Sequence, residues 1–175
     1  MIMKEIFSIS GIDIFQRDFN QIMIRGNEHE QLNQIINTGV SLNLPNENLK
    51  IVSNENILIA KHSFDQWNLI YFNDQNYRDV LKLVSNLNSN NQVLASDYSY
   101  GQVYFDISGE KKNYYLNKLT HFDLRLKKFP VNTMAQTLIA RIDCSIYHLK
   151  EKYIITCNKS FEDYFTQRLA DSINL

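Results

Sequence analysis

The chain has 175 residues, a formal net charge of −1, 44% hydrophobic residues and 12% aromatic residues. This length fits one domain, or one domain made of two fused halves, and the apolar fraction is ample for a hydrophobic core. Lysine and arginine are scattered along the chain, whereas a nucleic-acid-binding protein normally shows a basic patch, so no nucleic-acid partner is expected.

The N-terminal segment, residues 1–15, reads MIMKEIFSISGIDIF and is interrupted by Lys4, Glu5 and Asp13. It therefore lacks the continuous apolar stretch of a signal peptide. No stretch of the chain approaches the roughly 20 apolar residues of a membrane span. We expect a soluble, cytoplasmic protein with no membrane partner.

The first half alternates strand and helix patterns. A strand pattern ends at Gly26, a helix pattern follows, and two further strand patterns precede a second helix. The three strand patterns are 21–26, 56–62 and 67–73. The apolar faces are Leu32, Ile35, Ile36 and Val40 on the first helix, and Tyr77, Val80, Leu81, Val84 and Leu87 on the second.

The second half repeats this order. Its first strand pattern ends at Gly109, a helix pattern covers 110–120, and further strand patterns lead to a last helix. The strand patterns are 102–109, 135–141, 145–149 and 153–158. The apolar faces are Tyr115, Leu116 and Leu119 on the first helix, and Phe161, Phe165, Leu169 and Ile173 on the last. Ser160 and Asp163 have the spacing of a capping box at the start of that last helix.

Short words also recur in the two halves. Leu58-Ile59-Ala60 matches Leu138-Ile139-Ala140, and Ile70-Tyr71-Phe72-Asn73 is similar to Ile155-Thr156-Cys157-Asn158. Matching words in a matching element order indicate an internal duplication. The predicted fold class is α+β, with duplicated βαββα (ferredoxin-like) halves, about 18–90 and 96–175, which form one domain over residues 1–175.

The residues that carry chemistry form no recognisable catalytic pattern. The five glycines give neither a dinucleotide-binding fingerprint nor a phosphate loop. Cys144 and Cys157 lie in apolar strand patterns, which favours buried free thiols over metal ligands. None of the four histidines has a companion at ligand or triad spacing. We expect no catalytic, cofactor-binding or metal-binding residue on this chain.

Several stretches are similar to known families. Residues 97–109, DYSYGQVYFDISG, resemble the Asp-x-Ser-x-Gly…Ile-Ser-Gly opening shared by the glycine-cleavage T protein and its relatives. Residues 121–141, HFDLRLKKFPVNTMAQTLIAR, resemble the Asp-Leu…Phe-Pro…Gln-Thr-x-Leu-Ala-Arg signature of the gamma subunit of heterotetrameric sarcosine oxidase, with Asn132 in place of a common glycine. Residues 158–165 resemble that family's Arg-Ser-Phe-x-x-Tyr ending, with Lys159 instead of arginine. The resemblance covers roughly residues 20–172.

This resemblance implies a folate-binding-domain-like fold of the aminomethyltransferase type and a non-catalytic gamma subunit. It implies that the whole complex demethylates sarcosine oxidatively to glycine, and that the one-carbon unit passes to tetrahydrofolate or leaves as formaldehyde. FAD, FMN, NAD and tetrahydrofolate would belong to the partner alpha, beta and delta subunits. Three alternatives stay open: a gamma-like subunit of an N-methylglutamate dehydrogenase-type complex, a free-standing folate-binding module, and a homo-oligomeric interaction protein.

Gln136 and Thr137 are expected to open an apolar strand. In the T protein, to which this chain is similar, paired acidic residues begin the corresponding strand, and one of them serves aminomethyl transfer on folate. An amide and a hydroxyl can form hydrogen bonds, but they cannot balance an iminium charge as a carboxylate does. The resemblance thus implies a retained scaffold without its reaction.

Five residues are candidates for an interface with the partners: Phe129, Arg141, Gln136, Tyr98 and Tyr100. Pro130 biases Phe129 toward an extended backbone, so the ring either reaches a neighbour or fills the chain's own core. Arg141 ends a strand and meets either an acidic partner surface, or Asp143 or solvent.

Tyr98 and Tyr100 alternate with Asp97 and Ser99, and we expect the two tyrosines to face outward. For Asp97 and Ser99 two interpretations stay open: an interface or folate-contact remnant, or a cap on the turn before the strand at 102–108. Asp123 and Arg125 flank Leu124 at a spacing that suits an intrachain ion pair.

Overall fold

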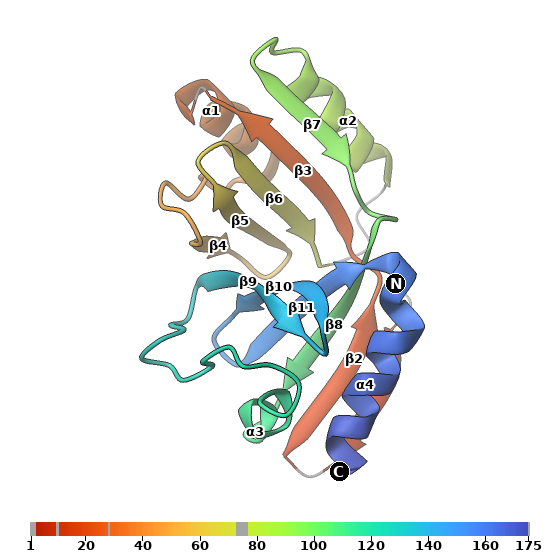
Figure 1. Ribbon diagram of the computed structural model, residues 1–175. Coiled ribbons are helices and arrows are strands. Elements are labelled where there is room, and N and C mark those ends of the chain that lie inside the picture. Colours follow the sequence, from red (N-terminus) through yellow and green to blue (C-terminus); the bar gives the residue numbers. More distant parts are fainter. Residues whose placement is uncertain (1–2, 10, 28, 73–76, 175) are drawn as a thin grey trace. The chain divides into compact units, whose positions relative to one another are not determined.

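The computed structural model describes residues 3–9, 11–27, 29–72 and 77–174 (Figure 1). The chain divides into two compact units. The middle unit is Phe19–Ser99, and the N/C unit joins the segment up to Asp18 with the segment from Tyr100 onward. Within the described ranges, no helix has the length and apolar character that a membrane crossing requires.

The middle unit is a five-stranded antiparallel sheet with two helices packed on one face. Its strands are β3 (Asn20–Gly26), β4 (Ile51–Ser53), β5 (Ile57–Ser63), β6 (Gln66–Tyr71) and β7 (Val93–Asp97), in the order β4-β5-β6-β3-β7. Its helices are α1 (His29–Val40) and α2 (Tyr77–Asn88). Strand residues two apart, such as Ile22 and Ile24, share a core with the helical stripes that include Leu32 and Val80. This core surrounds Trp67, which is 1% exposed.

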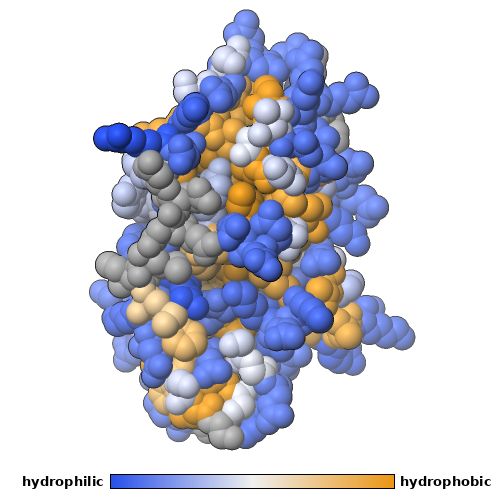
Figure 2. All heavy atoms as spheres, turned by 180° about the vertical axis from the view of Figure 1, so that it is seen from behind, coloured by the Kyte–Doolittle hydropathy of each residue, from blue (hydrophilic) through white to orange (hydrophobic). Residues whose placement is uncertain are grey.

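A groove of about 780 Å³ lies between α1 and α2. Its apolar lining includes Ile35, Val40 and Leu83, and its polar lining includes Asp79 and Lys82. Figure 2 shows apolar surface of this unit bordered by strips of hydrophilic side chains. The groove follows from the amphipathic pattern of both helices, whose polar residues stay at its margins.

The N/C unit is a six-stranded antiparallel sheet. Its strands are β1 (Met3–Ile9), β2 (Ile12–Arg17), β8 (Gln102–Ser108), β9 (Thr133–Ile139), β10 (Ile142–His148) and β11 (Lys152–Asn158), in the order β1-β2-β8-β11-β10-β9. Its helices are α3 (Lys112–Leu116), the 3-10 turn η1 (Lys159–Phe161) and α4 (Glu162–Asn174). Figure 1 shows α4 running along this sheet, and Phe165 and Leu169 of α4 share a core with Phe105 and Ile155 of the strands.

The segment between α3 and β9 covers the rest of this core without forming a long helix. Leu124 and Phe129 from this segment are buried in the core, and Phe122 packs against it. Asn132 has a φ of +60°, and its N–H donates to the carbonyl of His148 over 2.8 Å. Because asparagine tolerates the left-handed region better than most residues, it can take a backbone position that otherwise favours glycine.

The first strand of each repeat is exchanged between the two sheets. β2 precedes β3 in the chain but pairs with β8, where Ile14 lies opposite Ile107. β7 precedes β8 but pairs with β3, where Ala95 lies opposite Ile24. The two repeats therefore run from β2 to α2 and from β7 to α4, each with the order β-β-α-β-β-β-α. The internal duplication is confirmed at the level of element order, and each unit contains one strand from the other repeat.

Several local predictions were wrong. The words at 58–60 and 138–140 lie on β5 and at the end of β9, which occupy different places in their sheets, so their likeness does not mark equivalent positions. The words at 70–73 and 155–158 do fall at β6 and β11, which correspond, although Asn73 is outside the described residues. The helix expected over 110–120 is helical only over Lys112–Leu116.

The capping box at Ser160 is also incorrect. The side chain of Asn158 caps the N-terminus of η1, because its Oδ1 accepts the backbone N–H of Ser160 over 3.0 Å. Phe161 therefore belongs to η1, and α4 begins at Glu162. Asparagine can fill this capping role as well as serine.

Candidate functional site

Gln136 and Thr137 lie in the middle of β9. The strand begins at Thr133, which pairs with His148, so the expectation that the two residues open the strand is wrong. Successive strand residues point to opposite faces. Gln136 is exposed and lies opposite Ser145, whereas Thr137 is half-buried and lies opposite Cys144.

Gln136 begins a row of polar side chains that crosses the sheet. Ser145 on β10 lies opposite Gln136, and Thr156 on β11 lies opposite Ser145. The hydroxyl of Thr156 donates to Oε1 of Gln102 over 3.0 Å, which extends the row to β8. The row borders a cavity of about 620 Å³. The cavity is lined by Gln102, Gln136, Thr137, Leu138, Asp143, Cys144, Ser145, Thr156 and Asn158.

The chemistry of this cavity is that of a hydrogen-bonding surface. Its lining offers amides, hydroxyls and the carboxylate of Asp143, with no histidine, lysine or arginine among the lining residues. Acid–base or nucleophilic catalysis needs a nucleophile or reacting group beside a positioned base. The arrangement instead suits recognition of a polar ligand or of a partner's surface.

The two cysteines lie directly opposite each other on β10 and β11, and both are buried free thiols, as predicted. The hydrogen bond to Cys157 and then burial raise the pKa of the Cys144 thiol. A buried thiol of this kind is a poor nucleophile, because the thiolate is the reactive form. The thiol of Cys144 therefore adds packing rather than reactivity to the cavity wall.

Phe129 fills the core of the N/C unit. Its side chain is 2% exposed, and its ring lies 5.1 Å from that of Phe122, 5.2 Å from that of His148 and 6.0 Å from that of Tyr153, measured between centroids. The interpretation that Pro130 presents this ring to a neighbour is incorrect, because a ring packed on three sides cannot reach a partner without leaving its own core. Core packing, the other interpretation, is what the structure shows.

Arg141 lies at the tip of the β9–β10 hairpin. Its side chain is exposed, and no ion pair with Asp143 or any other described residue holds it. Its backbone has a φ of +68°, and that of Ala140 is +51°. The hairpin tip thus carries an arginine with no carboxylate partner among the described residues. Its backbone has a conformation that non-glycine residues rarely adopt.

Tyr98 and Tyr100 are 37% and 79% exposed, as their alternation with smaller polar residues predicted. Between them, Ser99 donates to Oδ1 of Asp97 through its N–H (3.0 Å) and its hydroxyl (2.6 Å). Asp97 also accepts the hydroxyl of Tyr77. Burial tends to raise the pKa of Asp97, but the hydrogen bonds from Ser99 and Tyr77 outweigh it and hold that pKa below its usual value. The turn-capping interpretation of Asp97 and Ser99 is confirmed, and the interface role of the tyrosines stays a prediction.

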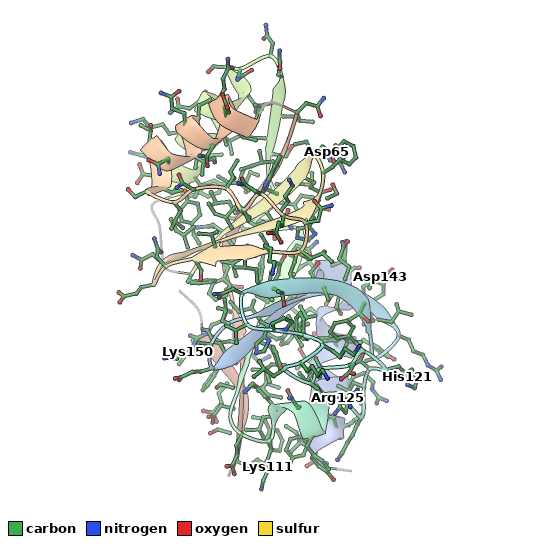
Figure 3. All side chains as sticks on the ribbon, turned by 90° about the vertical axis from the view of Figure 1, so that its left-hand side faces the viewer. Asp65, Lys111, His121, Arg125, Asp143 and Lys150 are labelled. Atoms are coloured by element: carbon green, nitrogen blue, oxygen red, sulfur yellow. The ribbon has the colours of Figure 1, made fainter. Side chains whose placement is uncertain are left out.

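Asp123 and Arg125 form the expected intrachain ion pair. The guanidinium of Arg125 donates to both carboxylate oxygens of Asp123, at 2.8 Å from Nε and 2.5 Å from Nη2. Hydrogen bonding to Arg125 lowers the pKa of Asp123 to about 2. Figure 3 labels Arg125 together with His121, and both residues are exposed. An exposed pair of this kind adds little to stability.

The comparisons with known proteins fit this architecture. The model of the family described as "Sarcosine oxidase, gamma subunit family" matches residues 27–174. The chain belongs to this family. The family expected from the stretches at 121–141 and 158–165 is thereby confirmed. No curated protein matches the sequence significantly.

Two solved structures share the fold of this gamma subunit family member. A chain of the heterotetrameric sarcosine oxidase from Corynebacterium sp. U-96, in complex with pyrrole 2-carboxylate, matches with a TM-score of 0.83 at 16% identity, over 97% of this chain and 87% of that chain. The glycine cleavage system aminomethyltransferase T from Bartonella henselae matches with a TM-score of 0.68 at 9% identity, over 91% of this chain and 45% of that chain. The chain thus spans less than half of the T protein. These similarities confirm the predicted aminomethyltransferase-type fold.

The sequence reasoning missed a buried carboxylate in the family member's N/C unit. Asp106 on β8 is 5% exposed, and its Oδ2 lies 2.6 Å from Nζ of Lys152 and 3.7 Å from a guanidinium nitrogen of Arg17. The sequence did contain an indication of this residue, because Asp106 interrupts the otherwise apolar stretch VYFDI at 103–107. A lone acid in a strand is ambiguous, and its two cationic neighbours come from strands that are distant in sequence.

A buried histidine in the middle unit was missed as well. Nε2 of His62 lies 2.9 Å from the amide nitrogen of Asn68, and both residues are buried. Because that amide nitrogen is a donor, Nε2 accepts, and the imidazole is neutral. Burial lowers the pKa of His62 to about 4. No group of three or more His, Cys, Asp or Glu side chains in the described ranges is placed to hold a metal ion.

Proposed function

We propose that this chain is the non-catalytic gamma subunit of a heterotetrameric sarcosine oxidase, in which it assembles with alpha, beta and delta subunits. The observation that carries the proposal is the family match over residues 27–174. The match to a chain of a heterotetrameric sarcosine oxidase supports it, because nearly the whole of both chains is superposed.

In this proposal the complex demethylates sarcosine oxidatively to glycine, and the one-carbon unit passes to tetrahydrofolate or leaves as formaldehyde. FAD, FMN and NAD would be held by the partner subunits and would supply the electron transfer. Tetrahydrofolate would likewise bind a partner subunit. This chain supplies a folded surface on which the complex is built.

The chemistry of the polar row supports a non-catalytic role. By resemblance, the T-protein reaction needs a carboxylate at one of the two positions where this chain has Gln136 and Thr137. The hydroxyl of Thr137 lies opposite a buried thiol rather than a base. Neither side chain can take up a proton at neutral pH, so neither can serve as a general base.

Reconstitution tests the proposal. The chain is produced alone and together with the alpha, beta and delta subunits, and sarcosine-dependent oxygen uptake and visible flavin absorbance are measured for both preparations. We expect uptake and flavin only in the co-purified complex, and neither in the isolated chain. Flavin bound stoichiometrically to the isolated chain, or an isolated chain that consumes oxygen with sarcosine, would contradict the proposal.

Two further measurements separate the alternatives. A complex that oxidises N-methylglutamate in preference to sarcosine would identify the related dehydrogenase-type complex. A chain that retains folate but captures no flavoprotein would identify a free-standing folate-binding module.

A further inference from the structure

A second cavity, of about 510 Å³, lies beneath the β9–β10 hairpin of the N/C unit. Its lining holds four side chains that are cationic or can become so, and no aspartate or glutamate. These side chains are Lys118, His121, Arg141 and Arg168, and the remaining lining residues are Asn117, Leu119, Thr120, Leu138, Ala140 and Tyr164. On a chain whose net charge is −1, this concentrates positive potential in a concave place.

The hairpin turn that closes this cavity has an unfavourable backbone conformation. Ala140 and Arg141 both have positive φ angles, +51° and +68°. A two-residue turn of this kind normally carries asparagine or aspartate followed by glycine, because other side chains clash with the backbone there. A residue kept in such a conformation is an indication of function when the surroundings hold it in place.

Three hydrogen bonds hold the turn in place. The N–H of Ala140 donates to the carbonyl of Leu119 over 2.8 Å. The hydroxyl of Thr120 donates to the carbonyl of Leu138 over 2.7 Å, and the hydroxyl of Tyr164 donates to the carbonyl of Ala140 over 3.3 Å. The position of Arg141 is therefore fixed by α4 and by the segment after α3.

Contacts within the chain hold Arg168 and Lys118 in place beside the cavity, and the carboxylate that pairs with Arg168 does not belong to the cavity lining. The guanidinium of Arg168 lies 5.7 Å from the ring centroid of Tyr164 and pairs with Asp171, while its buried Nε has no hydrogen-bond partner among the described residues. Nζ of Lys118 donates to the carbonyl of Ser172 over 2.8 Å. Arg141 itself has no acidic partner among the described residues. Such a site attracts a carboxylate.

Apolar side chains beside the cations favour a protein as the source of that carboxylate. Leu138 is 56% exposed and Tyr164 is 47% exposed, and both line the same cavity as Arg141. Tyrosine and arginine are among the residue types that contribute most binding free energy at protein interfaces. A small free anion, in contrast, would gain no binding free energy from the adjoining apolar surface.

We propose that this cavity receives an aspartate or glutamate side chain of a partner subunit, which pairs with Arg141 and is supported by Arg168. This inference rests on the proposed function, since it identifies where a partner of the assembled complex docks. Leu138 and Tyr164 pack against the chain that carries the acidic residue. The strained turn is retained because it directs Arg141 toward this group.

The experiment measures the affinity of the full-length chain for the complex of the other subunits. Arg141→Gln keeps a polar side chain and removes its charge, and we expect it to weaken binding at least about tenfold at low salt. The salt dependence of binding should become shallower as well. Arg125→Gln is the matched control, because Arg125 is exposed, does not line the cavity and loses the same charge. We expect that control to bind as the parent chain does.

Three outcomes would overturn the inference. If the parent chain does not bind the other subunits, the proposed function itself fails. If Arg141→Gln binds as tightly as the parent chain while the parent binds well, this inference alone fails. If Arg125→Gln weakens binding as much as Arg141→Gln, overall charge and not the cavity is responsible.

A second arm separates the partner's carboxylate from a free anion. The melting temperature of the isolated chain is measured in sodium succinate and in sodium chloride at equal ionic strength. We expect no difference between the two salts. A rise in succinate that disappears in Arg141→Gln, together with unchanged assembly of that variant, would identify a small-anion site and overturn the docking proposal.

Discussion

The two units cover equivalent sheets in different ways. In the middle unit, two 12-residue helices carry the apolar stripes that close the core. In the N/C unit, the counterpart of α1 is the five-residue helix α3, and the irregular segment that follows it contributes Phe122, Leu124 and Phe129. The comparison teaches that a regular helix and a set of large side chains on an irregular segment can bury the same kind of sheet face.

The irregular cover has a consequence that the helical cover lacks. A helix satisfies its own backbone groups, whereas backbone groups of the segment after α3 need other partners. The N–H of Phe122 donates to the hydroxyl of Thr120, and the carbonyl of Leu119 accepts the N–H of Ala140. Few side chains of this segment pack against the sheet, so each of them contributes more to the stability of the unit. Contacts of this segment with the β9–β10 hairpin also fix the cationic cavity at Arg141.

The largest expected effect is that of Phe129→Ala. Removal of a ring that is 2% exposed leaves a cavity in the core, and we expect the free energy of unfolding of the isolated chain to fall by about 3–5 kcal/mol. Urea denaturation followed by circular dichroism measures this change. Phe64→Ala is the matched control, because Phe64 is 76% exposed, and it should change stability by less than about 0.5 kcal/mol. Equal stability of the two variants would show that the irregular segment does not carry the packing.

Each unit contains a buried histidine that makes the stability of the folded chain depend on pH. The pKa of His62 is about 4 in the folded chain against 6.5 when unfolded, so the unfolded chain binds the proton first. Stability should therefore be fully present above pH 6.5 and should fall as the pH drops toward 4, by up to about 3 kcal/mol. Burial also lowers the pKa of His148, on the equivalent strand of the N/C unit, and adds a loss of the same sign.

Urea denaturation at a series of pH values tests this dependence. His62→Gln should flatten most of it, because the variant has no imidazole to protonate. A profile that is the same for the parent chain and His62→Gln would contradict the assignment of the neutral buried imidazole.

The buried carboxylate distinguishes the N/C unit as well. Asp106→Asn keeps the shape of the side chain but removes the charge that pairs with Lys152 and Arg17. We expect a loss of about 2 kcal/mol, because a charge-assisted hydrogen bond is broken and two cations lose their counter-charge. Asp123→Asn, which breaks the exposed pair with Arg125, should cost much less in the same urea assay, because solvent screens that pair. Equal losses would show that burial does not strengthen the pair at Asp106.

The smallest effect has the opposite sign. Arg141→Gly should stabilise the isolated chain by about 0.5–1 kcal/mol, because relief of the positive φ outweighs the entropy that the more flexible unfolded chain gains. Differential scanning calorimetry detects such a shift. Arg141→Ala keeps the strained backbone and should give no gain. A destabilised Arg141→Gly variant would show that the arginine side chain supports the fold rather than a partner.

Much of this protein followed from the sequence. The alternation of apolar residues on the strands and the helical stripes through Leu32 and Leu169 set most of the elements and the duplication, because side-chain periodicity is local. The stretches at 97–109 and 121–141 were sufficient to indicate the family, and the outward position of Tyr100 followed from its neighbours.

Only the tertiary structure decided the rest. The exchange of β2 and β7 between the sheets could not be read from either strand, because pairing depends on partners that are distant along the chain. The inward position of Phe129 depended on Tyr153 and His148, which lie on other strands. The cationic cavity at Arg141 likewise requires α4 to meet the β9–β10 hairpin. Local patterns fix which face of an element is apolar, whereas long-range packing decides which side chains meet.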